Sequence, residues 1–138
     1  MSRLLATRDR FLARRGRQLA LSLAATRAVI GAAALLAPGA PATPWVGGEE
    51  ARRPSVRLFA RTLGGRDLAL GLGALLAVRR GRPVRGWVEA GGLADAGDSV
   101  ATLLAWRSLP RRSRLVVLAL TLGAATASAA LAGVADPG

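Results

Sequence analysis

The chain of 138 residues contains no cysteine and no histidine. Without cysteine it can form no disulfide, no thiol redox couple and no thiolate metal site. Without histidine it lacks the commonest metal ligand and general base, and no nucleophilic triad has its usual proton acceptor. We therefore expect a protein that is not an enzyme, with no cofactor and no metal.

Aromatic residues are scarce as well, at 4% of the chain, although hydrophobic residues make up 51% and the mean hydropathy is +0.34. The apolar bulk therefore comes from alanine, leucine, valine and glycine. This composition is too apolar for an ordinary soluble domain of this length. It is typical of helices that pack closely through small residues inside lipid.

All 20 basic residues are arginine, and 8 acidic residues leave a net charge of +12. In a soluble protein this excess would indicate nucleic-acid binding. Here most arginines lie in groups at the ends of apolar segments, at 3–17, 52–57, 79–85 and 107–114. That distribution is typical of lipid-headgroup anchors, and neither a sheet-like pattern nor aromatic stacking motifs are present. We expect the lipid bilayer as a partner, and no nucleic acid.

The apolar periodicity predicts an all-α fold, a bundle of four transmembrane helices that follows a short amphipathic basic segment at 1–17. The membrane domain spans 18–135, with helices at about 18–37, 55–78, 84–106 and 113–134. Proline and glycine make 38–54 a loop. A disordered tail is an alternative for 1–17. A signal peptide is the alternative for the first helix, but that run is long and Arg27 interrupts it.

The arginine groups also predict orientation. Segments 1–17 and 79–85 carry 10 arginines, whereas 52–57 and 107–114 carry 7. By the positive-inside rule the first pair faces the cytoplasm. We expect a multi-pass protein of the cell membrane with both termini cytoplasmic.

The third predicted helix organises the chain. The stretch from Trp87 to Trp106 has the length of a bilayer-spanning helix and is bracketed by two tryptophans, yet it contains Glu89, Asp95 and Asp98. A carboxylate at the centre of a membrane is costly, so such residues are usually paired and usually functional.

Depth along each helix, at about 1.5 Å per residue, predicts what faces these acids. The second and third helices run in opposite directions, which sets Arg66 and Asp67 level with Asp95 and Asp98. Arg27 lies midway along the first helix, at a similar depth. Five charges from three helices are thus expected in one layer near the bilayer centre, joined by charge-assisted hydrogen bonds.

Two more charged residues belong to the candidate site. Arg61 lies about two turns from the layer and would bring its net charge to zero. Glu89 is either part of a carboxylate path with the aspartates or paired with Arg85, four residues before it. The i, i+3 spacing of Asp95 and Asp98 would allow a shared proton, but that spacing is common.

Two interpretations of the layer remain open. In one, it binds or conducts a small polar species, an ion or a proton. In the other, the charges fix helix register and assembly in an accessory subunit of a larger membrane complex. A site shared with another subunit is also possible, and small residues on one face of the fourth helix favour a homo-oligomer. That stripe is Ala119, Gly123, Ala127 and Ala130.

At ARTLGGRDLALGLGALLA (60–77) and AGGLADAGDSVATLLA (90–105) the chain resembles a group of uncharacterised small bacterial membrane proteins that is loosely DoxX-like. The matching positions are Gly64, Arg66 and Asp67, then Asp95 and Asp98. The resemblance implies a four-helix membrane fold and no established activity. The absence of cysteine departs from redox-active four-helix membrane proteins.

Overall fold

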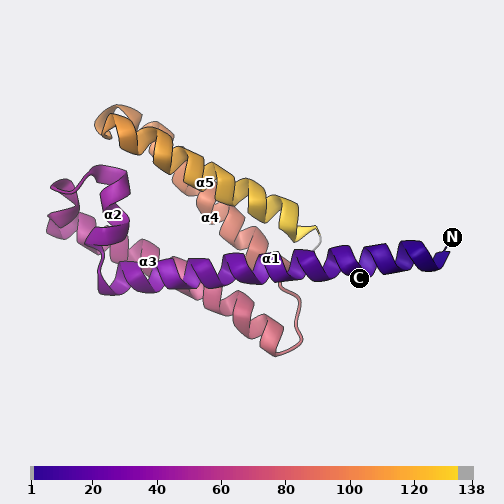
Figure 1. Cartoon of the computed structure of the whole chain (residues 1–138). Helices are drawn as coiled ribbons and strands as arrows, with labels where there is room; N and C mark the ends of the chain where they lie inside the picture. The colour runs from indigo at the N-terminus through magenta and orange to yellow at the C-terminus, as the bar shows by residue number, and fades with distance from the viewer. Residues whose placement is uncertain (1, 134–138) are drawn as a thin grey trace.

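The computed structural model describes the backbone of residues 2–133 and the side chains of residues 14–133. Over that range the chain forms helices and no strand, so the predicted all-α class is confirmed (Figure 1). The elements are α1 (Ser2–Leu36), α2 (Gly39–Val46), the short 3-10 helix η1 (Glu50–Arg52), α3 (Pro54–Arg79), α4 (Arg85–Leu104), the short 3-10 helix η2 (Trp106–Ser108) and α5 (Arg111–Ala132).

The first helix is longer than expected. The predicted basic segment at 1–17 and the predicted helix at 18–37 form one uninterrupted α1 of 35 residues. Its sequence is rich in alanine, leucine and arginine, which are strong helix formers, and contains no proline. In Figure 1 the N-terminal part of α1 projects beyond the ends of the other helices.

The predicted loop at 38–54 is wrong in part, because α2 and η1 lie within it. Pro38 is the N-cap of α2 and Pro41 lies in its first turn, where backbone N–H groups have no intrahelical acceptor. These prolines are therefore compatible with a helix start. The helix ends at Val46, and the C-cap residue Gly47 has a φ of 86°, which favours glycine.

The other helices begin and end within two residues of the predicted positions. Ser55 does not cap α3, which instead begins with Pro54 at its first position. Pro110 is the N-cap of α5.

The long helices form two close pairs (Figure 1). α1 packs along α3, and α4 packs along α5, whereas α3 and α4 contact each other much less despite the short turn between them. α2 lies across one end of the molecule and contacts α1, α3 and α5.

Glycine brings α1 and α3 into backbone contact. A Cβ added at Gly31 would lie 2.4 Å from the backbone N of Leu68, and one added at Gly71 would lie 2.5 Å from the carbonyl O of Ala24. No side chain fits at either position. Such close approach through small residues is the usual packing of membrane helices, which have no hydrophobic force to drive them together.

A glycine also allows close contact between α3 and α4, at Trp87. A Cβ added at Gly73 would lie 2.2 Å from the Trp87 indole, so the ring covers this glycine. Trp87 nevertheless stays 41% exposed.

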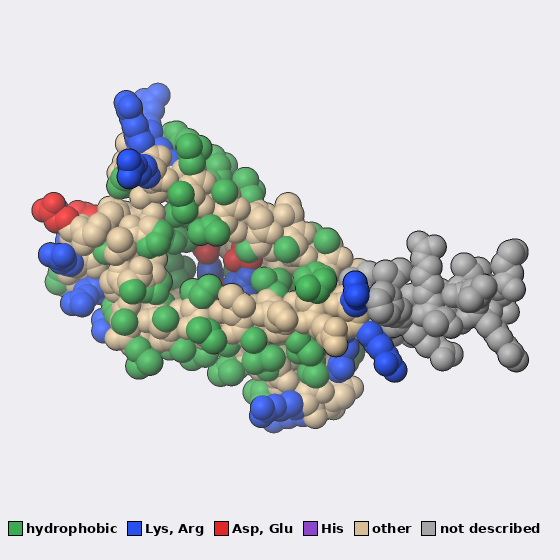
Figure 2. Space-filling view, in the orientation of Figure 1, with side chains coloured by type: hydrophobic (Ala, Val, Ile, Leu, Met, Phe, Trp, Pro, Cys, Tyr) green, Lys and Arg blue, Asp and Glu red, His purple; other side chains and the backbone are tan. Residues whose placement is uncertain are grey.

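Large apolar side chains lie outside and small or polar ones inside. The buried residues of the four long helices are mostly alanine and glycine, with Ser99, Thr102, Thr121, Ser128 and Asp95 among them. Leucine, valine, isoleucine and phenylalanine side chains are exposed on all four, and they cover much of the face seen in Figure 2.

Two helical segments, Arg14–Leu36 and Arg111–Ala132, are long and apolar enough to cross a membrane. Only 28% and 22% of their apolar windows are buried, unlike the core helix of a soluble protein.

Candidate functional site

Five charged side chains from α1, α3 and α4 meet between the two helix pairs. We call Arg27, Arg66, Asp67, Asp95 and Asp98 the charge cluster. Figure 2 shows acidic and basic side chains at the bottom of a hollow between the two halves of the molecule. α1 supplies one arginine, α3 the adjacent Arg66 and Asp67, and α4 two aspartates one turn apart.

Arg27 is the contact point of all three helices. Its Nη1 donates to Oδ1 of Asp67 at 3.1 Å, and its Nη2 donates to Asp95 and, at 3.2 Å, to the carbonyl O of Gly91. The side chains of Arg27 and Asp95 are only 10% and 11% exposed. A charged pair withdrawn this far from solvent depends on its hydrogen bonds.

Arg66 makes the second link between α3 and α4. Its Nη1 and Nη2 donate to the two carboxylate oxygens of Asp98 at 3.1 and 2.8 Å, and its Nε donates to Oδ1 of Asp67 at 3.1 Å. Oδ1 of Asp67 thus accepts from both arginines. The cluster is continuous, with Asp67 as the bridge.

Two hydroxyl groups of α4 bond to the backbone carbonyls of the cluster's aspartates, and one of them also meets a hydroxyl of α5. The Thr102 hydroxyl donates to the carbonyl O of Asp98 at 2.7 Å. The Ser99 hydroxyl lies 2.9 Å from the carbonyl O of Asp95 and 2.7 Å from the Thr121 hydroxyl. Sequence reasoning missed Ser99 and Thr121. Ser99 follows Asp95 by four residues and so shares its helical face, which could have indicated it.

Arg61 lies outside the cluster. It is exposed, and its Nε donates to the carbonyl O of Leu35 at 3.1 Å. The last carbonyls of a helix lack intrahelical donors, so the end of α1 offers this guanidinium a free acceptor. Arg61 was expected to bring the net charge of the layer to zero, but its hydrogen bond is to Leu35 and not to an aspartate of the cluster.

Glu89 also lies apart from the cluster. It accepts from Nε of Arg85 at 2.7 Å, and the two side chains are 45% and 63% exposed. The structure shows the pair with Arg85 and no contact that would continue a carboxylate path to Asp95.

The cluster contains two arginines and three aspartates, so its formal charge is −1. Among the described residues, no group of three or more acidic, cysteine or histidine side chains is arranged to hold a metal ion. A cluster with a net negative charge can accept a proton on a carboxylate or attract a small cation.

Protein-family models, curated proteins and solved structures provide no match to this chain. The DoxX-like resemblance therefore stays a prediction, and functional inference comes from the charge cluster itself.

Proposed function

We propose that α1, α3, α4 and α5 all cross the cell membrane and that the charge cluster binds or conducts a small polar species, a proton or a monovalent cation. The observation that carries this proposal is the net negative charge of the cluster, which lies between two helix pairs that contact each other sparsely.

The distribution of side chains supports four spans. α3 and α4 carry charges that lower their hydropathy, but Arg66, Asp67, Asp95 and Asp98 are all ion-paired between the helices, where they are buried or half-buried. Outwardly these helices expose apolar side chains. On α3 these are Leu58, Phe59, Leu63, Leu72 and Leu76, and on α4 Trp87, Leu93, Val100, Leu103 and Leu104. Water would not favour such a surface, whereas lipid would.

The charge balance supports the chemistry. In a low-dielectric setting the net charge of −1 on the cluster is costly, and binding a proton or a cation removes it. Neither reaction needs a histidine or a cysteine. The position of the cluster between the two helix pairs also supports access, because small shifts of one pair against the other would change the exposure of the aspartates.

The accessory-subunit function is the second candidate. Each arginine of the cluster already has carboxylate partners, as expected of charges that fix helix register. The stripe on α5 that was predicted to favour assembly is exposed, and so is open to a second copy or another subunit. Its members are Ala119, Gly123, Ala127 and Ala130.

The test uses the purified full chain in liposomes. We expect a proton or monovalent-cation gradient to drive a flux that Asp95→Asn and Asp98→Asn abolish, whereas Glu89→Gln leaves it unchanged because Glu89 lies outside the cluster. Wild-type protein that shows neither flux nor stabilisation by any of these ions would remove the leading proposal. A stoichiometric partner recovered in mild detergent would then support the accessory function.

A further inference from the structure

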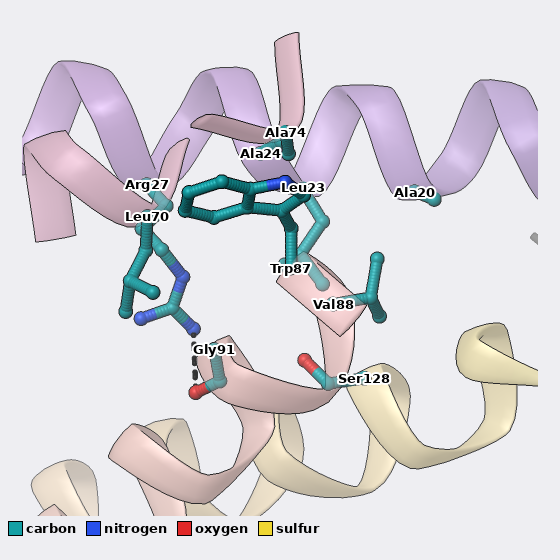
Figure 3. A pocket seen from close by; sticks show the side chains of 10 residues that line it. All are labelled: Ala20, Leu23, Ala24, Arg27, Leu70, Ala74, Trp87, Val88, Gly91 and Ser128. Atoms are coloured by element: carbon teal, nitrogen blue, oxygen red, sulfur yellow. Dashed lines mark hydrogen bonds between the residues drawn. The ribbon is translucent and has the colours of Figure 1, made fainter. Parts of the chain in front are cut away.

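A small, partly open cavity adjoins the charge cluster on the side of the turn between α3 and α4. Figure 3 shows its walls, to which α1 contributes Arg27, α4 contributes Trp87, Val88 and Gly91, and α5 contributes Ser128. Its volume is about 10 Å³. That is close to the smallest volume that holds one water molecule.

Ser128 is the unusual residue of this cavity. It is 1% exposed, and its Oγ has no hydrogen-bond partner. In Figure 3 this oxygen points toward the space lined by Trp87, Val88 and Gly91 of α4. A buried hydroxyl without a partner is costly, and such groups in native structures usually bond to an internal water.

The opposite wall is polar as well. The carbonyl O of Gly91 accepts one hydrogen bond from Arg27 and has a second lone pair available. The Arg27 guanidinium also lines the cavity. A buried water needs two to four polar partners, and Ser128, Gly91 and Arg27 together supply that number.

We propose that this cavity is a binding site for a single water molecule, held between the Ser128 hydroxyl and the contact of Arg27 with Gly91. The water connects α5, which contributes no charged side chain to the cluster, to the Arg27–Asp95 pair. It also extends the polar region one step toward the turn at 80–84. On that side lies an apolar cluster, two of whose members, Ala20 and Val88, also line the cavity; the others are Ala77, Val84 and Ala132.

This site goes beyond the proposed function, since it is defined by Ser128 and the cavity and does not depend on what the aspartates bind. The water site and the proposed function can therefore be tested independently of each other. Absence of flux would leave the water site intact, and a dry cavity would leave a flux through the aspartates possible.

The test is solid-state NMR of the labelled full chain in lipid, with magnetisation transferred from water. We expect strong early transfer to Ser128 and Gly91, and little to Val117, which is 1% exposed and does not line the cavity. Transfer to Ser128 and Gly91 as weak as that to Val117 would overturn the proposal.

Thermal unfolding of Ser128→Ala gives a second, independent measure. If the hydroxyl holds the water, its removal lowers the Tm; if the cavity is empty, removing an unpaired hydroxyl leaves the Tm unchanged or raises it, which contradicts the proposal. Ser99→Ala is the matched control, because Ser99 is buried and has partners on both α4 and α5. It should lower the Tm in either case.

Discussion

The guanidinium of Arg66 and the carboxylate of Asp98 form two parallel hydrogen bonds, of 3.1 and 2.8 Å, between α3 and α4. This fork-to-fork geometry requires a planar donor with two N–H groups in fixed positions. It is one of the few strong contacts between two helix pairs that otherwise meet sparsely. Replacements of Arg66 therefore report directly on how the pairs are held together.

Arg66→Lys should destabilise the protein although it keeps the charge. An ammonium cannot make both bonds to Asp98 and still reach Asp67, so we expect a loss of about 1–2 kcal/mol, the scale of one charged hydrogen bond discounted for partial exposure. Thermal unfolding in detergent measures the loss. Arg61→Lys is the control and should have little effect, because Arg61 is exposed and makes one bond to a carbonyl. Equal effects at the two sites would contradict the role assigned to the fork.

Arg27→Met should cost more. It leaves Asp67 with one arginine and Asp95 with none, and removing one member of a buried ion pair costs about 3–5 kcal/mol. The second substitution Asp95→Leu should recover part of that loss, because the cluster returns to a charge of −1. Denaturation of the single and double variants measures the recovery. A double variant less stable than Arg27→Met would contradict this, because it would show that Asp95 does not destabilise the protein when Arg27 is absent.

Gly64→Ala should disrupt the contact between α1 and α3. Its Cβ would lie 2.6 Å from the Cβ of Ala34 and 2.8 Å from the carbonyl O of Gly31, so backbone must move, at a cost of about 1–3 kcal/mol. The adjacent Gly65→Ala is a matched control, because nothing lies within 4 Å of its added Cβ. It should be neutral or stabilise the helix by up to about 1 kcal/mol. We expect the melting temperature of Gly64→Ala to lie below that of Gly65→Ala; the reverse order would contradict the close contact at Gly64.

The absence of cysteine makes topology easy to test. Gly48→Cys lies between α2 and η1, Pro83→Cys lies between α3 and α4, and both positions are exposed. With the termini in the cytoplasm, an impermeant maleimide added to intact cells or spheroplasts should label Gly48→Cys only. Labelling of Pro83→Cys alone would reverse the orientation, and labelling of both would contradict an odd number of membrane crossings between them.

Much of this arrangement follows from residue spacing. The depth argument brought Arg27, Arg66, Asp67, Asp95 and Asp98 to one layer, where the structure also joins them by hydrogen bonds. Helix rise is constant, so axial position can be obtained from residue number alone.

Residue spacing could not predict which acceptor each arginine would bind. The guanidinium of Arg61 is long enough to reach the unpaired carbonyls at the end of α1, and that choice depends on where α1 ends. The pairing of α1 with α3 and of α4 with α5 depends on which small residues meet across an interface. Ser128 carries no signal in the sequence, since its importance comes from a cavity that only the packed helices create.

The uninterrupted α1 has a mechanical consequence. A helix of 35 residues extends about 50 Å, well beyond the roughly 30 Å of a hydrocarbon core, so with α1 crossing the membrane as we propose, its basic N-terminal portion would continue the same helix outside the lipid. Arg27 lies on the same helix, roughly 25 Å from the middle of that portion. In that arrangement, a force exerted on the N-terminal portion by headgroups or by a neighbouring protein would reach the Arg27 guanidinium as a tilt of one continuous helix.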